Sequence, residues 1–425
     1  MSEHHVDSEG HRTTEGSARR PLPVRFAGLA LTGLLPLYPL VPRFPLWGPL
    51  GTDDVIPLLA IGTAAVVLLM TGDWRRAASP VLMMLGVLAG VATLAAILAA
   101  ASPGGALVAI ARVAGRLSLY AVLVVAIGKL LRAPERRRLL AVIACVAVFE
   151  GLVGVVAYGG KVQGPWQTGM LSYPASQMPE HGRVRVQGTF GGAVPEGQLF
   201  LNRANFYSAY LVMGLAALGV FFADRRYRLW ALLGTAVVIG GILVSFSRMS
   251  LVAALLAVVA LALLHRGGRA LAVVVVLVAL ALMLVSPIRE RFLGLDTDRI
   301  QQWRIATRVI VAHPALGAGD RQYLDEAFRL SGGVGVPVVR TPHNSILYAT
   351  ASYGIPAGLA LLALYAVLVC TALAAWRRRH SAEAAALVAL VAAFLLHDVT
   401  NNLFFIPEVA LTFWMTFAAT ETGDD

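Results

Sequence analysis

The chain has 425 residues, of which 58% are hydrophobic and only 14% are charged, and its formal net charge is +11. A soluble domain carries about a quarter charged residues, so the composition excludes an ordinary globular enzyme. The arginines stand in short clusters between apolar stretches, not along one face, which argues against nucleic acid as a partner. The partner that the composition predicts is the lipid bilayer.

The cysteine content argues against a protein held together by disulfides or by zinc bound to cysteines. Cys145 and Cys370 are the two cysteines, and each lies inside an apolar run. A disulfide framework or a cysteine-built zinc site is therefore not expected. The segments that we assign below to the outside hold no cluster of acidic residues, cysteine or histidine at ligand-like spacing. We therefore expect neither a metal ion nor a cofactor.

In chain order, residues 1–22 are too polar to pack and predict a disordered cytoplasmic tail, and residues 23–425 predict a single transmembrane domain. A membrane span needs about 20 apolar residues. About twelve stretches approach that length, which predicts an all-α, polytopic membrane protein. The expected spans are 24–41, 55–70, 80–101, 106–131, 139–158, 205–222, 229–246, 249–264, 270–286, 355–376, 382–398 and 403–420.

The connections between these spans alternate in charge. The basic ones are 75–76, 129–138, 225–228, 266–269 and 377–379. All fall on the side of the N-terminal tail, which the positive-inside rule assigns to the cytoplasm. Both termini are therefore predicted to be cytoplasmic, in a bacterial cytoplasmic membrane.

Two long connections, about 159–204 and 287–354, fall on the external side, and loops of this length are uncommon unless they are functional or disordered. The second, between spans nine and ten, predicts a helical loop. Asp298 is placed to cap a helix from Arg299 towards Ala312, which His313 and Pro314 end. Gly317 and Gly319 then predict a turn.

Arg248 follows Ser245-Phe246-Ser247 in a tight external turn. It can be an arginine that snorkels to the interface, or it can bind an anion, because its planar fork holds a phosphate through two hydrogen bonds. Arg203 and Asn205 stand where the first external loop re-enters the membrane. A helix-start turn capped by Asn is the simpler interpretation of this pair, and substrate binding is the alternative.

Arg112 and Arg116 are four residues apart and share one face of the fourth span. Because a buried charge needs a partner, we expect Arg116 to pair with Glu150 of the fifth span. Arg112 lies closer to the outside and is a candidate ligand for substrate.

His343 stands where the large loop returns to the membrane. An interfacial histidine is commonly just a hydrogen-bonded polar residue, but its near-neutral pKa also makes His343 the best external candidate for a general base. The pair His397-Asp398 can orient a base or cap its helix end, and we favour capping.

With these residues in place, the chain resembles the superfamily of O-antigen ligases and Wzy-type polymerases, which are bacterial membrane glycosyltransferases. The resemblance covers about residues 185–376. It rests on the order and external placement of several short motifs. These are Gly188-Thr189-Phe190, Asn202-Arg203-x-Asn205-Phe206, Ser245-Phe246-Ser247-Arg248, Arg299-x-x-x-Trp303, His313-Pro314-x-x-Gly317-x-Gly319, and His343-Asn344 with Gly354 ten residues later.

The resemblance implies transfer of a glycan from undecaprenyl diphosphate to an acceptor hydroxyl outside the cytoplasm, without a metal ion. By position, Arg248 and Arg299 would hold the diphosphate, and His343 would be the base. Arg203, Asn205, Arg112 and Asn344 complete the predicted substrate-binding set. A diphosphate leaving group needs neutralisation and an alcohol nucleophile needs a base, so the residues agree with this chemistry.

The sequence departs from the family pattern in the Gly-x-x-Gly element, which is here Gly354-Ile355-Pro356-Ala357 with the next glycine at Gly358, and in an extra residue before Asn205. Ligase, repeat-unit polymerase and protein O-oligosaccharyltransferase therefore stay open. The acceptor hydroxyl then belongs to a lipid, a glycan or a protein. A transporter or flippase of an anionic lipid or small anion, or a membrane scaffold, is the alternative. A transporter should place charges in broken helices near the midplane, whereas the candidates here cluster at one interface.

Overall fold

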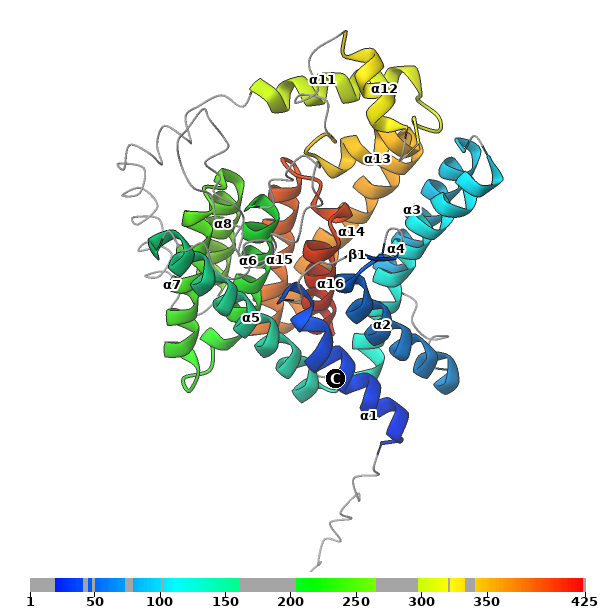
Figure 1. Cartoon of the computed structure of the whole chain (residues 1–425). Helices are drawn as coiled ribbons and strands as arrows, with labels where there is room; N and C mark the ends of the chain where they lie inside the picture. Colours follow the sequence, from blue (N-terminus) through cyan, green and yellow to red (C-terminus); the bar gives the residue numbers. More distant parts are fainter. Residues whose placement is uncertain are drawn as a thin grey trace, which may run out of the picture.

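The computed structural model of the chain describes residues 20–40, 45–47, 50–72, 79–100, 102–160, 204–264, 297–319, 322–332 and 341–422. The described part is almost entirely helical (Figure 1), which confirms the all-α prediction except for one short pair of antiparallel strands. The predicted tail and the predicted span 270–286 lie outside the described residues, apart from the last three positions of the tail.

The first part of the chain forms α1 (Leu22–Leu29), a π-helical turn η1 (Ala30–Leu34), a 3₁₀ turn η2 (Leu35–Leu40), β1 (Pro45–Trp47), β2 (Leu50–Gly51), α2 (Thr52–Thr71), α3 (Pro80–Leu98), α4 (Pro103–Leu130) and α5 (Ala133–Gly160). The sequence sets several of these starts. Ser79 and Ser102 each accept a backbone N–H of the first turn, at 3.2 and 3.1 Å, and a proline follows each of them. Such Ser-Pro pairs begin helices because the proline lacks an N–H to satisfy.

The second part forms α6 (Ala204–Gly219), η6 (Val220–Phe222), α7 (Arg228–Val244), α8 (Arg248–Leu264), α11 (Thr297–Ala312), α12 (Tyr323–Leu330), α13 (Ser345–Tyr353), α14 (Ile355–Arg379), α15 (Ala382–Asp398), η7 (Leu403–Phe405) and α16 (Pro407–Glu421). The helix predicted from Arg299 to Ala312 is present as α11. It begins at Thr297, so Asp298 lies in its first turn instead of capping it.

Five of the described helices are long and apolar enough to cross a membrane: Pro80–Leu98, Gly104–Leu130, Ala133–Tyr158, Ala204–Phe222 and Ile355–Arg379. Shorter apolar helices occur at Val55–Thr71, Arg228–Val244 and Arg248–Leu264. These helices support a multi-span membrane protein, and the number of about twelve spans stays a prediction.

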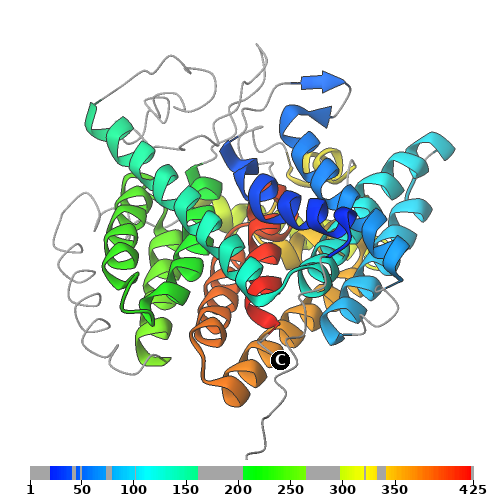
Figure 2. The ribbon, with the colours of Figure 1, turned by 90° about the horizontal axis from the view of Figure 1, so that it is seen from below.

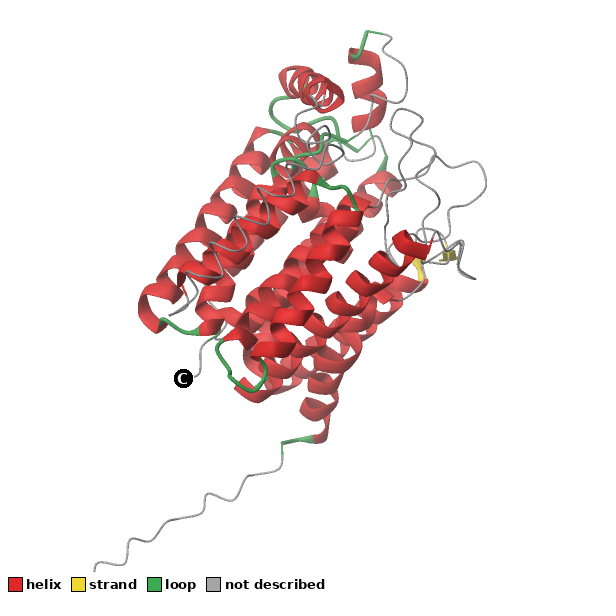
Figure 3. Ribbon diagram, turned by 90° about the vertical axis from the view of Figure 1, so that its left-hand side faces the viewer, coloured by secondary structure: helices red, strands yellow, loops and turns green. Residues whose placement is uncertain are grey.

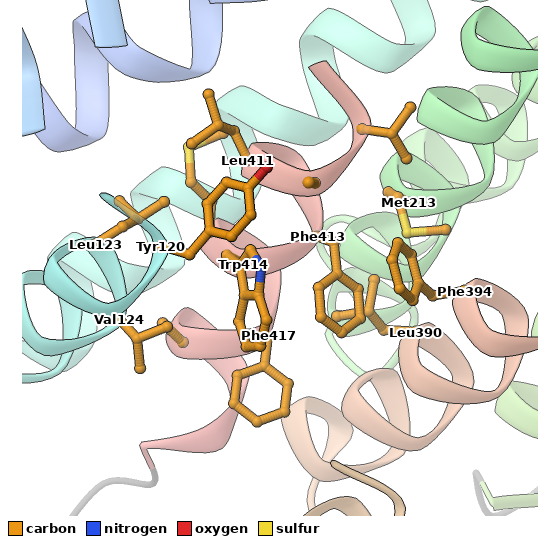
Figure 4. Close-up of a cluster of buried hydrophobic side chains, with 14 of the residues drawn as sticks. Tyr120, Leu123, Val124, Met213, Leu390, Phe394, Leu411, Phe413, Trp414 and Phe417 are labelled. Atoms are coloured by element: carbon orange, nitrogen blue, oxygen red, sulfur yellow. The ribbon is translucent and has the colours of Figure 1, made fainter. Parts of the chain in front are cut away.

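The centre of the bundle is formed by α6, α15 and α16. Seen from below in Figure 2, α16 lies near the middle, with α7 and α8 on one side and α2 and α3 on the other. Aromatic side chains fill this centre (Figure 4): the rings of Phe394 and Phe413 are stacked with centroids 4.1 Å apart, and Trp414 contacts Tyr120 of α4 and Phe417. Because these side chains are fully buried, they fix how the central helices pack.

The basic connections that the structure describes, 129–138, 225–228 and 377–379, lie at one end of the bundle. Arg20 donates to a backbone carbonyl at the end of α4 at 2.7 Å, and Arg137 of α5 pairs with Asp224 in the α6–α7 connection at 2.9 Å. Arg379 at the end of α14 donates to the carbonyl of Thr420 in the last turn of α16 at 3.0 Å. Their shared end agrees with the alternation predicted from the sequence, while its assignment to the cytoplasm stays a prediction.

The predicted external loop 287–354 contains α11, α12 and α13, which lie at the opposite end of the bundle (Figures 1 and 3). Glu326 of α12 joins two of these helices, since its carboxylate lies 2.9 Å from Nε2 of His313, directly after α11. Arg329 donates to the same carboxylate from Nε at 2.8 Å. Ile305 and Val309 of α11 pack on the buried face of α12. A small separate core therefore supports the group formed by α11, α12 and α13.

Candidate functional site

The turn between α7 and α8 is built by serines. Ser245 Oγ donates to the carbonyl of Ile242 at 2.6 Å and accepts the backbone N–H of Ser247 at 3.2 Å. Phe246 takes the left-handed conformation, with a φ of 53°, which a bulky residue adopts only when its surroundings hold it there. The turn therefore fixes Arg248, which is half-buried, as the first residue of α8.

A buried cluster of hydroxyls and one imidazole joins three helices beneath this turn. Ser250 Oγ of α8 lies 2.6 Å from Ser208 Oγ of α6 and 2.7 Å from Ser247 Oγ. It also lies 3.2 Å from Nε2 of His397 in the last turn of α15. All four side chains are buried. Inside an apolar bundle such groups satisfy one another, so the cluster holds the start of α8 against α6 and α15.

Arg299 brings α11 to the same place. The guanidinium of Arg299 interacts electrostatically with His397, although the two residues belong to α11 and α15. The start of α8 is therefore bound to the last turn of α15, and Arg299 at the start of α11 lies close enough to interact electrostatically with the same turn.

Asp398, the last residue of α15, holds a second set of contacts. Its Oδ1 accepts the hydroxyl of Ser345 at 2.7 Å and the backbone N–H of Phe404 at 3.1 Å, while its Oδ2 accepts the hydroxyl of Tyr365 at 2.8 Å. The backbone N–H that Asp398 satisfies belongs to η7, whereas the free groups at the end of its own helix are carbonyls, which a carboxylate cannot cap. The predicted capping of that helix end is therefore not the role of Asp398. A buried carboxylate with three donors forms a rigid joint between α13, α14 and α15.

His343 and Asn344 stand beside this joint. Asn344 caps α13 by accepting the backbone N–H of Leu347 at 2.9 Å, and its Nδ2 donates to the carbonyl of Val399 at 3.0 Å. Asn344 therefore has a structural role in this structure, and its predicted contact with substrate stays a prediction. His343 directly precedes this cap and is half-buried.

The predicted catalytic residues thus come from elements that converge on one segment, residues 397–399. Arg248 begins α8, which is bound through Ser250 to His397, and Arg299 acts on His397 from α11. His343 adjoins Asn344, which is bound to Val399. Arg248, Arg299 and His343 span 95 positions of the sequence. The fold brings the elements that carry them to the end of α15.

Two other predicted substrate ligands lie near the start of α6. Asn205 is the second residue of α6, and its backbone carbonyl lies 3.1 Å from Ser208 Oγ, which belongs to the buried cluster. Arg203 lies outside the described residues. Asn205 is therefore one helical turn from the cluster, and the role of Arg203 stays a prediction.

Arg112 is found in a different place from the other candidates. Arg112 and Arg116 both line a pocket between α3, α4, α13 and η7, which confirms that they share one helix face. Arg116 donates to the carbonyl of Phe405 at 3.3 Å. Glu150 interacts electrostatically with Tyr207 and Tyr210 of α6. Its pairing with Arg116 stays a prediction. The other residues that line this pocket are Leu88, Ala92, Val113, Leu117, Tyr353 and Phe405.

The His-Pro-x-x-Gly-x-Gly motif and Gly354 have a mechanical role. The backbone N–H groups of Ala318 and Gly319 donate to carbonyls in the last turn of α13 at 2.8 and 3.0 Å, and that of Ile355 donates to the carbonyl of Pro314 at 2.8 Å. Gly317, Gly319 and Gly354 have positive φ values, and a Cβ at Gly354 would lie 2.1 Å from the carbonyl oxygen of Ala315. The motif therefore clamps the end of α13 to the segment after α11.

Sequence reasoning missed the central part of the site. Ser208, Ser250 and the contact made by His397 were not recognised, although hydroxyls and an imidazole inside apolar spans are costly unless they have partners. The spacing Ser247-x-x-Ser250, which places two hydroxyls on one face at the start of α8, was the available signal.

No curated protein matches the chain. A family model does: residues 233–362, from α7 to the first third of α14, match O-antigen ligase. This segment carries Arg248, Arg299, His343 and the clamp motif. The match supports placement in the O-antigen ligase and polymerase superfamily and a ligase-like glycosyl transfer at a bacterial inner membrane.

Proposed function

We propose that the protein transfers a glycan from undecaprenyl diphosphate to an acceptor hydroxyl at the external face of the membrane. The observation that carries this proposal is the convergence of the start of α8, the start of α11 and the start of α13 on residues 397–399. Two cationic side chains and one imidazole are thereby gathered at one end of an apolar bundle, inside the segment that matches O-antigen ligase.

The reaction needs one base and one anion site. The imidazole of His343 takes the proton of the acceptor hydroxyl as its oxygen bonds to the anomeric carbon of the donor glycan. The bond between that carbon and the diphosphate oxygen breaks, and undecaprenyl diphosphate leaves with the electron pair. Arg248 and Arg299 stabilise the negative charge that develops on the leaving group. In this proposal the transfer uses no metal ion, because the two arginines supply the positive charge that the leaving group needs.

Arg112 and Arg116 line a small pocket away from the other candidates. It lies at the far end of α13 from His343, because Tyr353 closes the helix that Asn344 begins. Its walls combine apolar side chains with two guanidinium groups, which suits the boundary between an apolar chain and an anionic group. We assign Arg112 to binding of an anionic substrate there.

The direct test is a transfer assay with purified protein in nanodiscs, undecaprenyl-diphosphate-linked glycan and candidate acceptors. Release of undecaprenyl diphosphate together with glycan bound to an acceptor supports the proposal, and turnover should persist in excess EDTA. Loss of turnover that a divalent ion restores would contradict the metal-free mechanism. Movement of the lipid across the bilayer without transfer to any acceptor would favour a flippase instead.

The acceptor class is best read in a deletion strain. A ligase leaves finished lipid-linked polymer unattached, a polymerase leaves single lipid-linked repeats, and a protein O-oligosaccharyltransferase leaves its target proteins without glycan. Mass spectrometry of lipid-linked glycans, surface polysaccharide and envelope proteins distinguishes these three results.

A further inference from the structure

His397 has one ring nitrogen with a partner and one without. Its side chain is fully buried, and Nε2 lies 3.2 Å from Ser250 Oγ. Nδ1 is also buried and has no hydrogen-bond partner in the structure of the described residues. Leaving a buried polar atom without a partner is costly, so such an atom at a functional site requires an explanation.

The hydroxyl contacts decide which nitrogen of His397 carries the proton. Ser208 Oγ lies 2.7 Å from the carbonyl of Ala204, and a carbonyl can only accept, so Ser208 donates its one proton there. Ser208 must then accept from Ser250. Having donated its proton to Ser208, Ser250 accepts from both remaining partners.

These remaining partners of Ser250 are Ser247 Oγ at 2.7 Å and His397 Nε2 at 3.2 Å. Nε2 is therefore the nitrogen that bears hydrogen. A charged imidazole is costly inside an apolar bundle, so the ring is neutral here. In the neutral ring, Nδ1 then carries a lone pair and can only accept a hydrogen bond.

A lone pair at this place selects the chemistry of its partner. Phosphate oxygens at neutral pH are acceptors and would be repelled, whereas a hydroxyl can donate. We propose that His397 Nδ1 accepts a hydrogen bond from a hydroxyl of the carbohydrate substrate, next to the diphosphate that Arg299 holds. The inference rests on the proposed function and adds His397 to the residues that contact substrate. Nδ1 is enclosed in this structure, so the contact forms once substrate displaces the side chains that cover it.

Two substitutions separate the functions of the two nitrogens. In His397→Gln, the amide reaches the place of Nε2, so the donor to Ser250 is kept and the acceptor at Nδ1 is lost. In His397→Asn, the amide oxygen takes the place of Nδ1, and the donor to Ser250 is lost. The Gln variant should therefore keep the thermal stability of the protein, whereas the Asn variant should lower it.

The binding assay uses two probes, undecaprenyl diphosphate and undecaprenyl-diphosphate-linked N-acetylglucosamine, with each variant in nanodiscs. The quantity of interest is the ratio of the two affinities, which measures how much the sugar strengthens binding of the lipid. If the hydroxyl belongs to the glycan of the lipid-linked substrate, His397→Gln should reduce this ratio by about three- to tenfold, the contribution of one hydrogen bond. Affinity for undecaprenyl diphosphate alone should not change. If the hydroxyl belongs instead to the substrate that receives the glycan, the ratio of the two affinities should not change, and the KM for that substrate should rise by the same factor.

His397→Asn keeps an oxygen that can accept a hydrogen bond at the place of Nδ1. This variant should therefore stay close to the wild type in the ratio of the two affinities and in the KM for the substrate that receives the glycan. A Gln variant that equals the wild type in both measurements would show that Nδ1 meets an ordered water only, and would overturn the inference while leaving the proposed function intact. Equal losses in stability and in affinity for the bare lipid in both variants would show a purely structural histidine. Wild-type protein that binds neither lipid would overturn the proposed function and this inference together.

Discussion

The two ends of the bundle use polar side chains in opposite ways. At the end where the basic connections meet, Arg20 and Arg137 pair with carboxylates at 3.0 and 2.9 Å and stay partly exposed. At the other end, Ser208, Ser250 and His397 are fully buried. The charges at the first end are in contact with both solvent and carboxylate partners. The polar groups at the second end form a hydrogen-bonded network that is not accessible to solvent.

The difference has energetic consequences. An exposed ion pair contributes about 0–1 kcal/mol, because solvent screens it and the side chains lose freedom on pairing. A buried polar group that loses its partner costs about 1–3 kcal/mol, and more when it is charged. Substitutions of exposed charges should therefore be nearly silent, whereas substitutions in the buried network or at the residues predicted to act on substrate should lower stability or activity. The predictions below test this contrast.

The largest contrast should be between His343→Ala and Arg225→Ala. If His343 is the base, removing its imidazole should lower turnover by about two to four orders of magnitude, the range of general acid-base catalysis. Donor affinity should change little. Arg225 is exposed in the α6–α7 connection at the basic end, so its alanine variant should keep nearly full turnover. Single-turnover transfer measured on both variants provides the comparison, and full activity of His343→Ala would exclude this residue as the base.

The next contrast compares arginines that are predicted to hold diphosphate with one that pairs with a carboxylate. Arg248→Ala and Arg299→Ala should each weaken binding of undecaprenyl diphosphate by about ten- to a hundredfold, since a hydrogen bond to a charged group contributes about 1.5–3 kcal/mol. Lysine should restore only part, because it keeps the charge and loses the planar fork. Arg137→Ala, which removes the pair with Asp224, should leave the affinity unchanged. Equal affinities in all variants would contradict the assigned anion site.

The same contrast separates what the sequence revealed from what it did not. The basic end was predictable, because the positive-inside rule depends only on where arginines fall along the chain. The helix ending at His313-Pro314 was also predictable, because proline stops a helix locally. The contacts of His397 were not, because its partners Ser250 and Arg299 lie 147 and 98 positions away, and spacing within one helix does not determine which helices meet.

A third prediction concerns glycines at the two ends. Gly354→Ala should lower the thermal midpoint in detergent strongly, because φ is +86° and the new Cβ would lie 2.1 Å from the carbonyl oxygen of Ala315. Gly332→Ala, with a φ of +71° and open space around it, should cost only the backbone strain, about 1 kcal/mol. Gly128→Ala at the basic end meets Thr422 at an ordinary 3.4 Å and should be tolerated. A Gly354→Ala variant as stable as Gly128→Ala would contradict the clamp.

The smallest effect should come from Glu326, which joins α12 to the end of α11 at the surface. Hydrogen bonds from Arg329 and His313 lower the pKa of Glu326 from 4.5 to about 2. A carboxyl whose pKa is lower in the folded protein stabilises the fold fully above pH 4.5, and this contribution is lost as the pH falls from 4.5 through 2. Because the pair lies at the surface, the loss should be small, within the 0–1 kcal/mol of an exposed ion pair. Hydrogen exchange of α12 should therefore accelerate between pH 4.5 and 2, after correction for the intrinsic rate. Glu326→Gln should remove this pH dependence and should exchange faster already at neutral pH. If the wild type and Glu326→Gln follow the same pH profile, the carboxylate does not hold α12 in place.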